Sequence, residues 1–318
     1  MQVQPYRSGG HAPGVLERGT LEVAGVRRTY WLARAPDRAA PLLIVLHGTG
    51  MTGRVMARLT GLGVRGPAAG FTTVFPDGWK GRWHVGQPPD KEPALDDTAF
   101  LRLLSYRIES DGAARSWPIV LAGLSSGAWL AEHLARHAQL PVAVLFLVAG
   151  AALEWSRRNA PVPLLRATTV CIAGTGDPSV PYGGGPLPRA GRSGWLLRRR
   201  AVRHGGWSGE SVVAAVPATA ADWAAGNGIV AGPGIEEFPF QPGDLPVSRL
   251  SWTRPNCRPV TLFRIEGGGH DWPGGSPLLP ARVGGPVTHR LDATGILLDC
   301  AGRERAPRSG SRSLLPGS

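Results

Sequence analysis

Ser125 is the first residue of this chain whose type and setting suggest chemistry. It lies in the sequence GLSSG, between an apolar segment at 119–122 and a helical pattern at 126–138. A serine on a sharp strand-to-helix turn has a strained backbone, and the residues two before and two after it must be small. Gly123 and Gly127 meet that requirement, so Ser125 is a candidate nucleophile. Because the chain holds 45 glycines, an ordinary turn serine is the competing interpretation.

Two further residues could complete the chemistry of a nucleophilic serine, which needs a base and a carboxylate that orients the base. Asp177 follows the apolar segment 168–173 in the sequence GTGDP, and His270 follows the apolar segment 260–265 in the sequence EGGGH. The chain order Ser125, Asp177, His270 is the triad order of the α/β-hydrolase fold. Asp177 as a turn residue before proline and His270 as an ordinary loop histidine are the competing interpretations.

An oxyanion formed on a substrate needs hydrogen-bond donors. The backbone N–H of Ser126 is one predicted donor, because it starts the helix after the nucleophile and gains from the helix dipole. The second donor is assigned to Thr49, in the loop HGTG that follows the apolar segment 42–46. His47 opens this loop and is predicted to brace it rather than to act as a base.

Two tryptophans and two aspartates are candidates for supporting roles. Trp272, two residues after His270, and Trp83 are predicted to contact an acyl or aromatic part of the substrate, with packing in the core as the alternative. Asp96 and Asp97 stand directly before TAFL at 98–101, at the start of the helical pattern 97–108, and are predicted to cap it. Support of the active-site loops is the alternative for this pair.

No metal site and no cofactor are predicted. His133 and His137 are one helical turn apart, but no third ligand accompanies them and they do not form HExxH. The cysteines match no metal-ligand spacing and allow at most one disulfide; they are Cys171, Cys257 and Cys300. Cys171 lies within the apolar segment 168–173 and is expected in the core.

The elements that must position these residues alternate along the chain. The pattern predicts a hairpin of 20–23 with 28–34, then strands at 42–46, 71–75, 119–122, 142–148, 168–173 and 260–265, and helices near 54–60, 97–108, 126–138, 218–226 and 290–300. Near-continuous apolar strands separated by helices indicate an α/β fold with a mostly parallel central sheet and helices on both faces. In such sheets the functional loops gather at the carboxyl ends of the strands.

Length and composition favour a single domain, because 318 residues of which 42% are hydrophobic can form one large core. The predicted domain spans 16–301 and carries a surface insertion at 183–211. Residues 1–15 and 302–318 are rich in Gly, Pro, Ser and Arg and are predicted to be disordered. No membrane-spanning run and no signal-peptide pattern are present, so a cytoplasmic location is expected for the sequence as written, and secretion if the true N-terminus lies upstream.

The formal net charge of +12 raises the question of nucleic-acid binding. Lysine occurs only at Lys80 and Lys91, and arginines are spread over the whole length, which indicates a coding bias rather than a binding face. The one dense run of arginines lies in the predicted insertion. No nucleic-acid or membrane partner is therefore predicted.

Taken together, the motifs resemble the polyhydroxybutyrate depolymerase and feruloyl-esterase-like family of α/β-hydrolase esterases. The resemblance runs from Leu42 to about Asp299 and rests on PLLIVLHGTGMTG at 41–53, MARLTGLGVRGPAAGFTTVFPDGWKGRW at 56–83, the pair Asp96-Asp97, GLSSG at 123–127, GTGDPSVPY at 174–182, DWAAGNG at 222–228 and FRIEGGGHDWPGG at 263–275. It implies the α/β-hydrolase fold, a triad at Ser125, Asp177 and His270, and oxyanion donors at Thr49 and Ser126.

The chain departs from the pattern of this family in two places. Members often carry a cysteine just after the Asn-Gly near 228, paired with a later cysteine, but here the position is Ile229, which leaves Cys257 without an implied partner and weakens a secreted location. The arginine-rich segment 186–210 is longer than the pattern suggests. No polymer-binding domain is visible, which disfavours activity on insoluble polyester.

The residues and the resemblance thus predict a serine esterase that acts on short-chain, hydroxyacyl or feruloyl esters through an acyl-enzyme. A noncatalytic binding module on the same fold and an acyltransferase with the same triad are the alternatives. The expected partner is a small-molecule or oligomeric ester. The sequence does not indicate the oligomeric state.

Overall fold

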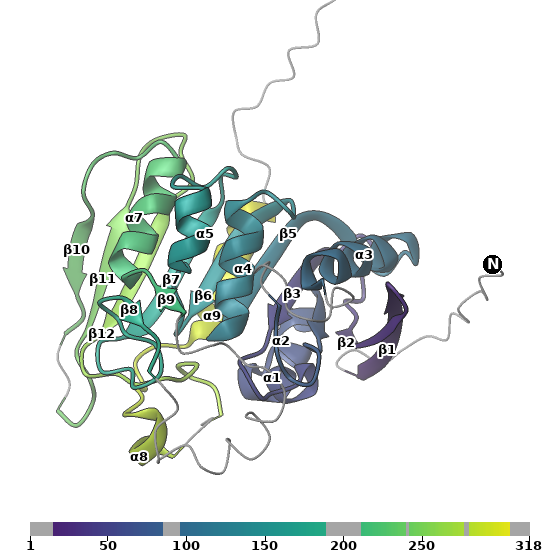
Figure 1. Ribbon diagram of the computed structural model, residues 1–318, viewed down its shortest axis with the longest axis horizontal. Coiled ribbons are helices and arrows are strands. Elements are labelled where there is room, and N and C mark those ends of the chain that lie inside the picture. Colours follow the sequence, from purple (N-terminus) through teal and green to yellow (C-terminus); the bar gives the residue numbers. More distant parts are fainter. Residues whose placement is uncertain (1–14, 85–95, 189–210, 240–241, 277–279, 306–318) are drawn as a thin grey trace, which may run out of the picture.

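A large central sheet organises the chain. The computed structural model describes residues 15–84, 96–188, 211–239, 242–276 and 280–305. Within these ranges ten strands form one sheet in the order β1-β2-β4-β3-β5-β6-β7-β12-β11-β10 (Figure 1). The six strands from β4 to β12 are parallel, and the outer pairs β1-β2 and β11-β10 run antiparallel to their neighbours. The predicted α/β-hydrolase architecture with a mostly parallel sheet is confirmed.

Each predicted strand and helix has a counterpart in the structure, whereas β8 to β11, α2, α5 and α8 were not predicted. The strands of the large sheet are β1 (Leu16–Val23), β2 (Val26–Ala33), β3 (Pro41–Leu46), β4 (Thr72–Pro76), β5 (Arg115–Leu124), β6 (Val142–Val148), β7 (Thr168–Gly174), β10 (Gly234–Glu237), β11 (Val247–Trp252) and β12 (Val260–Ile265). A separate pair consists of β8 (Gly185–Pro186) and β9 (Val212–Val213). The helices are α1 (Gly53–Thr60), α2 (Leu62–Ala68), α3 (Asp97–Ser110), α4 (Ser126–Arg136), α5 (Glu154–Asn159), α7 (Val216–Gly226), α8 (Ala281–Gly284) and α9 (Ala293–Arg305).

Helices cover both faces of the sheet. On one face α4 and α7 pack through residues such as Leu130 and Trp223, and on the other face α1 and α9 pack through residues such as Met56 and Leu297. Figure 1 shows α4, α5 and α7 in front of the sheet and α9 behind it. Every residue of β3, β6 and β7 is buried, which is why their sequences are apolar without alternation. Among the described residues, no helix has the length and apolar character needed to cross a bilayer.

The structure departs from the predicted bounds at several places. The N-terminal hairpin is confirmed, but β1 already begins at Leu16. Helix α9 continues to Arg305, whose guanidinium donates to the carbonyls of Ala69 and Gly70, so the predicted disordered tail from 302 starts too early. The remainder of both predicted disordered ends and the central part of the predicted insertion, 189–210, lie outside the described residues.

The three cysteines are free thiols. Cys171 lies fully buried in β7, and burial raises the pKa of its thiol to about 12, so it is an unreactive core residue as expected. Cys257 Sγ lies 4.0 Å from the point where a Cβ on Gly228 would sit. Cys257 therefore lies near the turn at which members of the family that this sequence resembles often carry a second cysteine. In this chain that position is Ile229, which supplies no thiol.

Candidate active site

Ser125 lies on a strained turn between β5 and α4. Its φ and ψ angles are 56° and −122°, and its N–H donates to the carbonyl of Val148 at 2.9 Å. Only small residues fit beside this turn: a Cβ on Gly123 would collide with the backbone of Gly127, and a Cβ on Gly127 would lie 2.6 Å from the carbonyl oxygen of His47. The glycines of GLSSG thus allow strand, helix and the loop after β3 to meet around a partly exposed Ser125.

His270 and Asp177 form a direct pair. His270 Nδ1 and Asp177 Oδ2 are 2.7 Å apart, on loops that follow the neighbouring parallel strands β12 and β7. Asp177 Oδ1 accepts the backbone amides of Ser179 and Val180 at 2.7 and 2.9 Å, which fixes the carboxylate. Because an ionised carboxylate only accepts, Nδ1 of His270 carries the proton and Nε2 is left as a proton acceptor.

Ser125 belongs to the same edge of the sheet as this pair. It follows β5, which is parallel to β7 and β12, so all three loops leave the sheet at its carboxyl edge. The hydrogen bonds of the described residues do not include one from Ser125 Oγ to His270. The structure therefore joins His270 and Asp177 directly and places Ser125 at their edge of the sheet.

The predicted oxyanion residues lie next to Ser125. Thr49 Oγ1 donates to Ser126 Oγ at 2.9 Å, which ties the loop after β3 to the start of α4. A Cβ on Gly48 would lie 3.4 Å from Ser125 Cβ, so the backbone of this loop passes beside the nucleophile. Ser126 is the first residue of α4, and its N–H has no partner within the helix. The backbone N–H groups of Thr49 and Ser126 are therefore suited to donate to a developing oxyanion.

His47 braces the loop at 47–51 that follows β3, as predicted. The ring is fully buried; its Nε2 accepts the N–H of Gly78 at 2.9 Å, so Nδ1 carries the proton and donates to the carbonyl of Gly48 at 2.8 Å. Burial lowers the pKa of His47 to about 4. Because Gly78 already occupies Nε2 and the pKa is this low, the imidazole is a weak proton acceptor, and its contacts are those of a structural residue.

Both candidate tryptophans take up packing positions. Trp83 is 3% exposed and its Nε1 donates to the carbonyl of His47 at 2.7 Å. Trp272 is 1% exposed and its Nε1 donates to Thr294 Oγ1 at 3.0 Å. Side chains buried to this degree offer almost no surface to a ligand, so the structure corrects the predicted substrate contacts of Trp83 and Trp272 in favour of the alternative, core packing.

The adjacent aspartates have two separate roles. Asp96 is the N-cap of α3 and accepts the amides of Thr98 and Ala99, as predicted. Asp97 is instead fully buried, with one carboxylate oxygen on Arg28 and the other on the N–H of His84. The sequence carries no signal for the inward direction of Arg28, which lies 69 positions from its partner.

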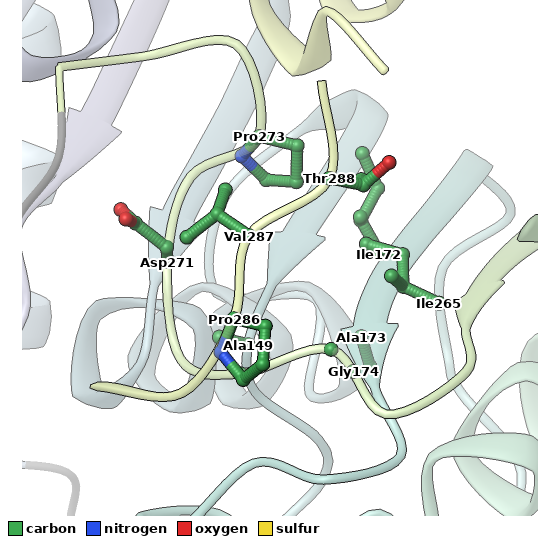
Figure 2. A pocket seen from close by; sticks show the side chains of 12 residues that line it. Ala149, Ile172, Ala173, Gly174, Ile265, Asp271, Pro273, Pro286, Val287 and Thr288 are labelled. Carbon is green, nitrogen blue, oxygen red and sulfur yellow. The ribbon is translucent and has the colours of Figure 1, made fainter. Parts of the chain in front are cut away.

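A small cavity lies against the loop at 266–273, which follows β12 and carries His270 (Figure 2). Its volume is about 10 Å³, which is about the space for one water molecule. The lining comes from the ends of β6 and β7, the loop after β12 and the segment 286–288, and includes Ala149, Ile172, Pro273 and Val287. In Figure 2 the carboxylate of Asp271 points away from Ile172 and Ile265. This cavity is too small for an acyl group and belongs to the packing beneath the loop.

The helical pair His133 and His137 meets a hydroxyl group. His133 Nδ1 and His137 Nε2 lie 2.8 and 3.2 Å from Ser156 Oγ, and the two rings are 4.5 Å apart. The described residues contain no group of three or more His, Cys, Asp or Glu side chains arranged for a metal ion.

Comparison with known proteins finds an esterase that is similar in sequence and solved structures that are similar in fold. No family model matches the chain. The chain is 31% identical over 277 residues to NocK of Nocardia uniformis subsp. tsuyamanensis, a protein whose name places it among the esterases; the match covers 82% of this chain and 76% of the relative. Among solved structures, the acetyl xylan esterase of Aspergillus awamori is 12% identical, with a TM-score of 0.54 over 80% of this chain and 94% of that one. The S-formylglutathione hydrolase of Agrobacterium tumefaciens is 14% identical, with a TM-score of 0.42 over 61% and 84%.

Proposed function

Because the chain belongs to the esterase family that includes NocK, we propose that it hydrolyses carboxylic esters through Ser125, His270 and Asp177. The observation that carries this proposal is the hydrogen bond from His270 Nδ1 to Asp177 Oδ2. It sets the tautomer in which Nε2 can take a proton from a hydroxyl group. Ser125 is the nucleophile, since its strained turn leaves it partly exposed at the same edge of the sheet.

The first half of the reaction forms the acyl-enzyme. His270 Nε2 takes the proton of Ser125 as Oγ attacks the ester carbonyl, and Asp177 stabilises the imidazolium. The negative charge that develops on the carbonyl oxygen is stabilised by the backbone N–H groups of Ser126 and Thr49. His270 then gives its proton to the leaving alcohol. No cofactor takes part.

The second half releases the acid and restores the enzyme. His270 deprotonates a water molecule, which attacks the acyl group on Ser125 and passes through a second oxyanion at the same donors. Collapse of this intermediate returns the proton from His270 to Ser125. The same residues therefore act twice, once with the alcohol as leaving group and once with water as nucleophile.

The substrate class is proposed from the motifs of the chain. The resemblance to polyhydroxybutyrate depolymerase and feruloyl-esterase-like enzymes favours short-chain, hydroxyacyl or feruloyl esters. Hydrolysis rates on p-nitrophenyl acetate, p-nitrophenyl butyrate, p-nitrophenyl 3-hydroxybutyrate and methyl ferulate show which of these ester classes the protein accepts. A rate on methyl ferulate more than tenfold below every aliphatic ester would reject the feruloyl class.

The nucleophile is tested by replacing Ser125 with alanine. Turnover of p-nitrophenyl acetate by Ser125→Ala should fall at least about a thousandfold, because triads lose this much or more without the nucleophile. A fluorophosphonate probe should label the wild type on Ser125 alone. Ser110→Ala is the matched control, since Ser110 is an exposed serine at the end of α3. Equal turnover in folded Ser125→Ala and Ser110→Ala proteins would reject the proposal.

A further inference from the structure

A buried ion pair lies behind the oxyanion loop. The side chains of Arg28 on β2 and Asp97 at the start of α3 are 1% and 0% exposed. The Arg28 guanidinium also lies 4.2 Å above the ring of Phe100. Removing two charges from water is costly, and a buried pair contributes little net stability compared with apolar side chains. The Arg28–Asp97 pair is therefore expected to have a role other than stabilising the fold, and its contacts indicate what that role is.

One set of contacts leads from Asp97 to the carbonyl of His47. Asp97 Oδ2 accepts the backbone N–H of His84. The preceding residue, Trp83, donates its indole N–H to the carbonyl oxygen of His47 at 2.7 Å, and the rings of Trp83 and His47 lie 4.7 Å apart. The position of Asp97 therefore affects the position of Trp83. The indole of Trp83 in turn holds His47, the first residue of the loop at 47–51.

A second set of contacts leads from Arg28 to the ring of His47. Arg28 Nη2 donates to the carbonyl of Asp77 at 3.3 Å. The next residue, Gly78, donates its N–H to His47 Nε2 at 2.9 Å. Both partners of the ion pair thus reach His47, one through its imidazole and the other through its carbonyl.

From His47 the constraint passes directly into the loop that faces Ser125. The imidazole donates to the carbonyl of Gly48, and the N–H of Met51 donates back to the same carbonyl at 3.1 Å. The N–H of Gly50 is bound to Gly81 at 2.8 Å, within the turn that also carries Trp83. Thr49, the proposed donor, sits between these fixed points.

We infer that the Arg28–Asp97 pair, acting through Trp83 and His47, positions the oxyanion loop, and that Asp97 and Trp83 are positioning residues of the esterase. This inference rests on the proposed function for its effect on catalysis. Its structural content, the coupling of a buried ion pair to the loop at 47–51, is independent of that function. The two can therefore be tested separately.

Trp83→Phe is the most selective test, because it keeps an aromatic ring and removes only the donor to His47. With p-nitrophenyl acetate, kcat should fall about tenfold while KM changes less than about twofold, since the loop acts on the transition state rather than on substrate binding. Asp97→Asn should show the same division between kcat and KM. Trp223→Phe is the matched control, because this buried indole on α7 donates to Glu132 on α4 at 3.2 Å rather than to the loop at 47–51; its kcat should stay within about twofold of the wild type.

Hydrogen exchange measures the coupling without any substrate. In Trp83→Phe and Asp97→Asn, amides of the segment 47–53 should exchange at least about tenfold faster than in the wild type, whereas the segment 216–226 should be unchanged. Unchanged exchange at 47–53 in both variants overturns the inference, as does an equal kcat in Trp83→Phe and Trp223→Phe. A wild type that hydrolyses no ester rejects the proposed function, and the exchange result then still decides the structural inference.

Discussion

Asp177 holds His270 at 2.7 Å with one carboxylate oxygen while its other oxygen accepts two backbone amides. The side chain of Asp177 is 2% exposed, so water does not compete for the imidazole. A carboxylate fixed at three points cannot turn away from the ring. The orientation of His270 is therefore set before any substrate arrives.

Asp177→Asn should abolish most of the activity without unfolding the protein. The amide keeps the shape of the carboxylate, but its NH₂ group favours the His270 tautomer with the proton on Nε2, which cannot accept one from Ser125. We expect kcat for p-nitrophenyl acetate to fall by about ten-thousand-fold, as in other triads. Asp111→Asn, at the exposed end of α3, is the control. Retention of more than a tenth of the wild-type kcat by Asp177→Asn would contradict the assignment of the acid.

Gly→Ala substitutions at a tightly packed and at an open position should have opposite effects on stability. A Cβ on Gly127 would lie 2.5 Å from the carbonyl oxygen of Leu46, so Gly127→Ala should lower the free energy of unfolding by about 2 to 3 kcal/mol. A Cβ on Gly302, within α9, meets nothing within 4 Å, so Gly302→Ala should raise it by up to about 1 kcal/mol. Urea denaturation measures both. Equal midpoints for Gly127→Ala and the wild type would refute the close packing.

The strained turn at Ser125 and the Asp177–His270 contact could be expected from the sequence because the information for them is local. Ser125 lies between a continuous apolar strand and a helical pattern, and its flanking glycines mark the close approach of backbone. Asp177 and His270 directly follow apolar strands, and strands of this kind belong in a parallel sheet whose carboxyl ends share one edge. Nothing beyond strand ends and chain order was needed to expect the Asp177–His270 pair.

Side-chain direction was harder to predict, because an aromatic residue near a catalytic loop has no pattern that says which way it points. Trp272 and Trp83 were expected to contact substrate, yet both turn inward and donate to buried oxygens. The pair of Arg28 and Asp97 depends on a contact between distant segments that composition cannot show. The exposed strand β10 was missed for another reason, since all four of its residues face solvent and show no apolar alternation.

A second buried ion pair predicts a large loss of stability from one substitution. Arg136 Nε donates to Glu132 Oε1 at 2.6 Å, both side chains are fully buried, and the Arg136 guanidinium also binds Asp222 and the carbonyl of Ala160. Burial raises the pKa of Glu132. Arg136→Met would leave this buried carboxyl without its charged partner, so we expect the free energy of unfolding to fall by about 3 to 5 kcal/mol.

The control for this substitution is an exposed ion pair of the same spacing. Arg107 and Asp111 lie on the surface of α3, with 39% and 28% of their side chains exposed. Arg107→Met should change the free energy of unfolding by less than about 1 kcal/mol. Urea denaturation of the two variants compares the effects directly, and a loss below about 1 kcal/mol in Arg136→Met would show that the buried network does not stabilise the fold.

The stability of the protein should fall as the pH decreases from about 6.5 towards 4. Burial lowers the pKa values of His47 and His133 to about 4 in the folded state, from 6.5 for a free histidine. Below pH 6.5 the unfolded chain therefore binds protons that the folded chain excludes, and stability decreases until the folded histidines also titrate near pH 4. The raised pKa values of Glu132 and Asp77 act in the opposite direction, so the contribution of His47 is isolated by comparing a His47 variant with the wild type.

His47→Gln should flatten this dependence, because it removes one titrating group from the unfolded chain while its side-chain oxygen can still accept the N–H of Gly78. Unfolding free energies from urea titrations at pH 7, 6 and 5 give the slope, to which one histidine contributes at most about 1.4 kcal/mol per pH unit. His289→Gln, at an exposed position, is the matched control. If His47→Gln kept the full slope, His47 would not be excluded from protonation in the folded protein, and its role as a neutral brace of the oxyanion loop would be wrong.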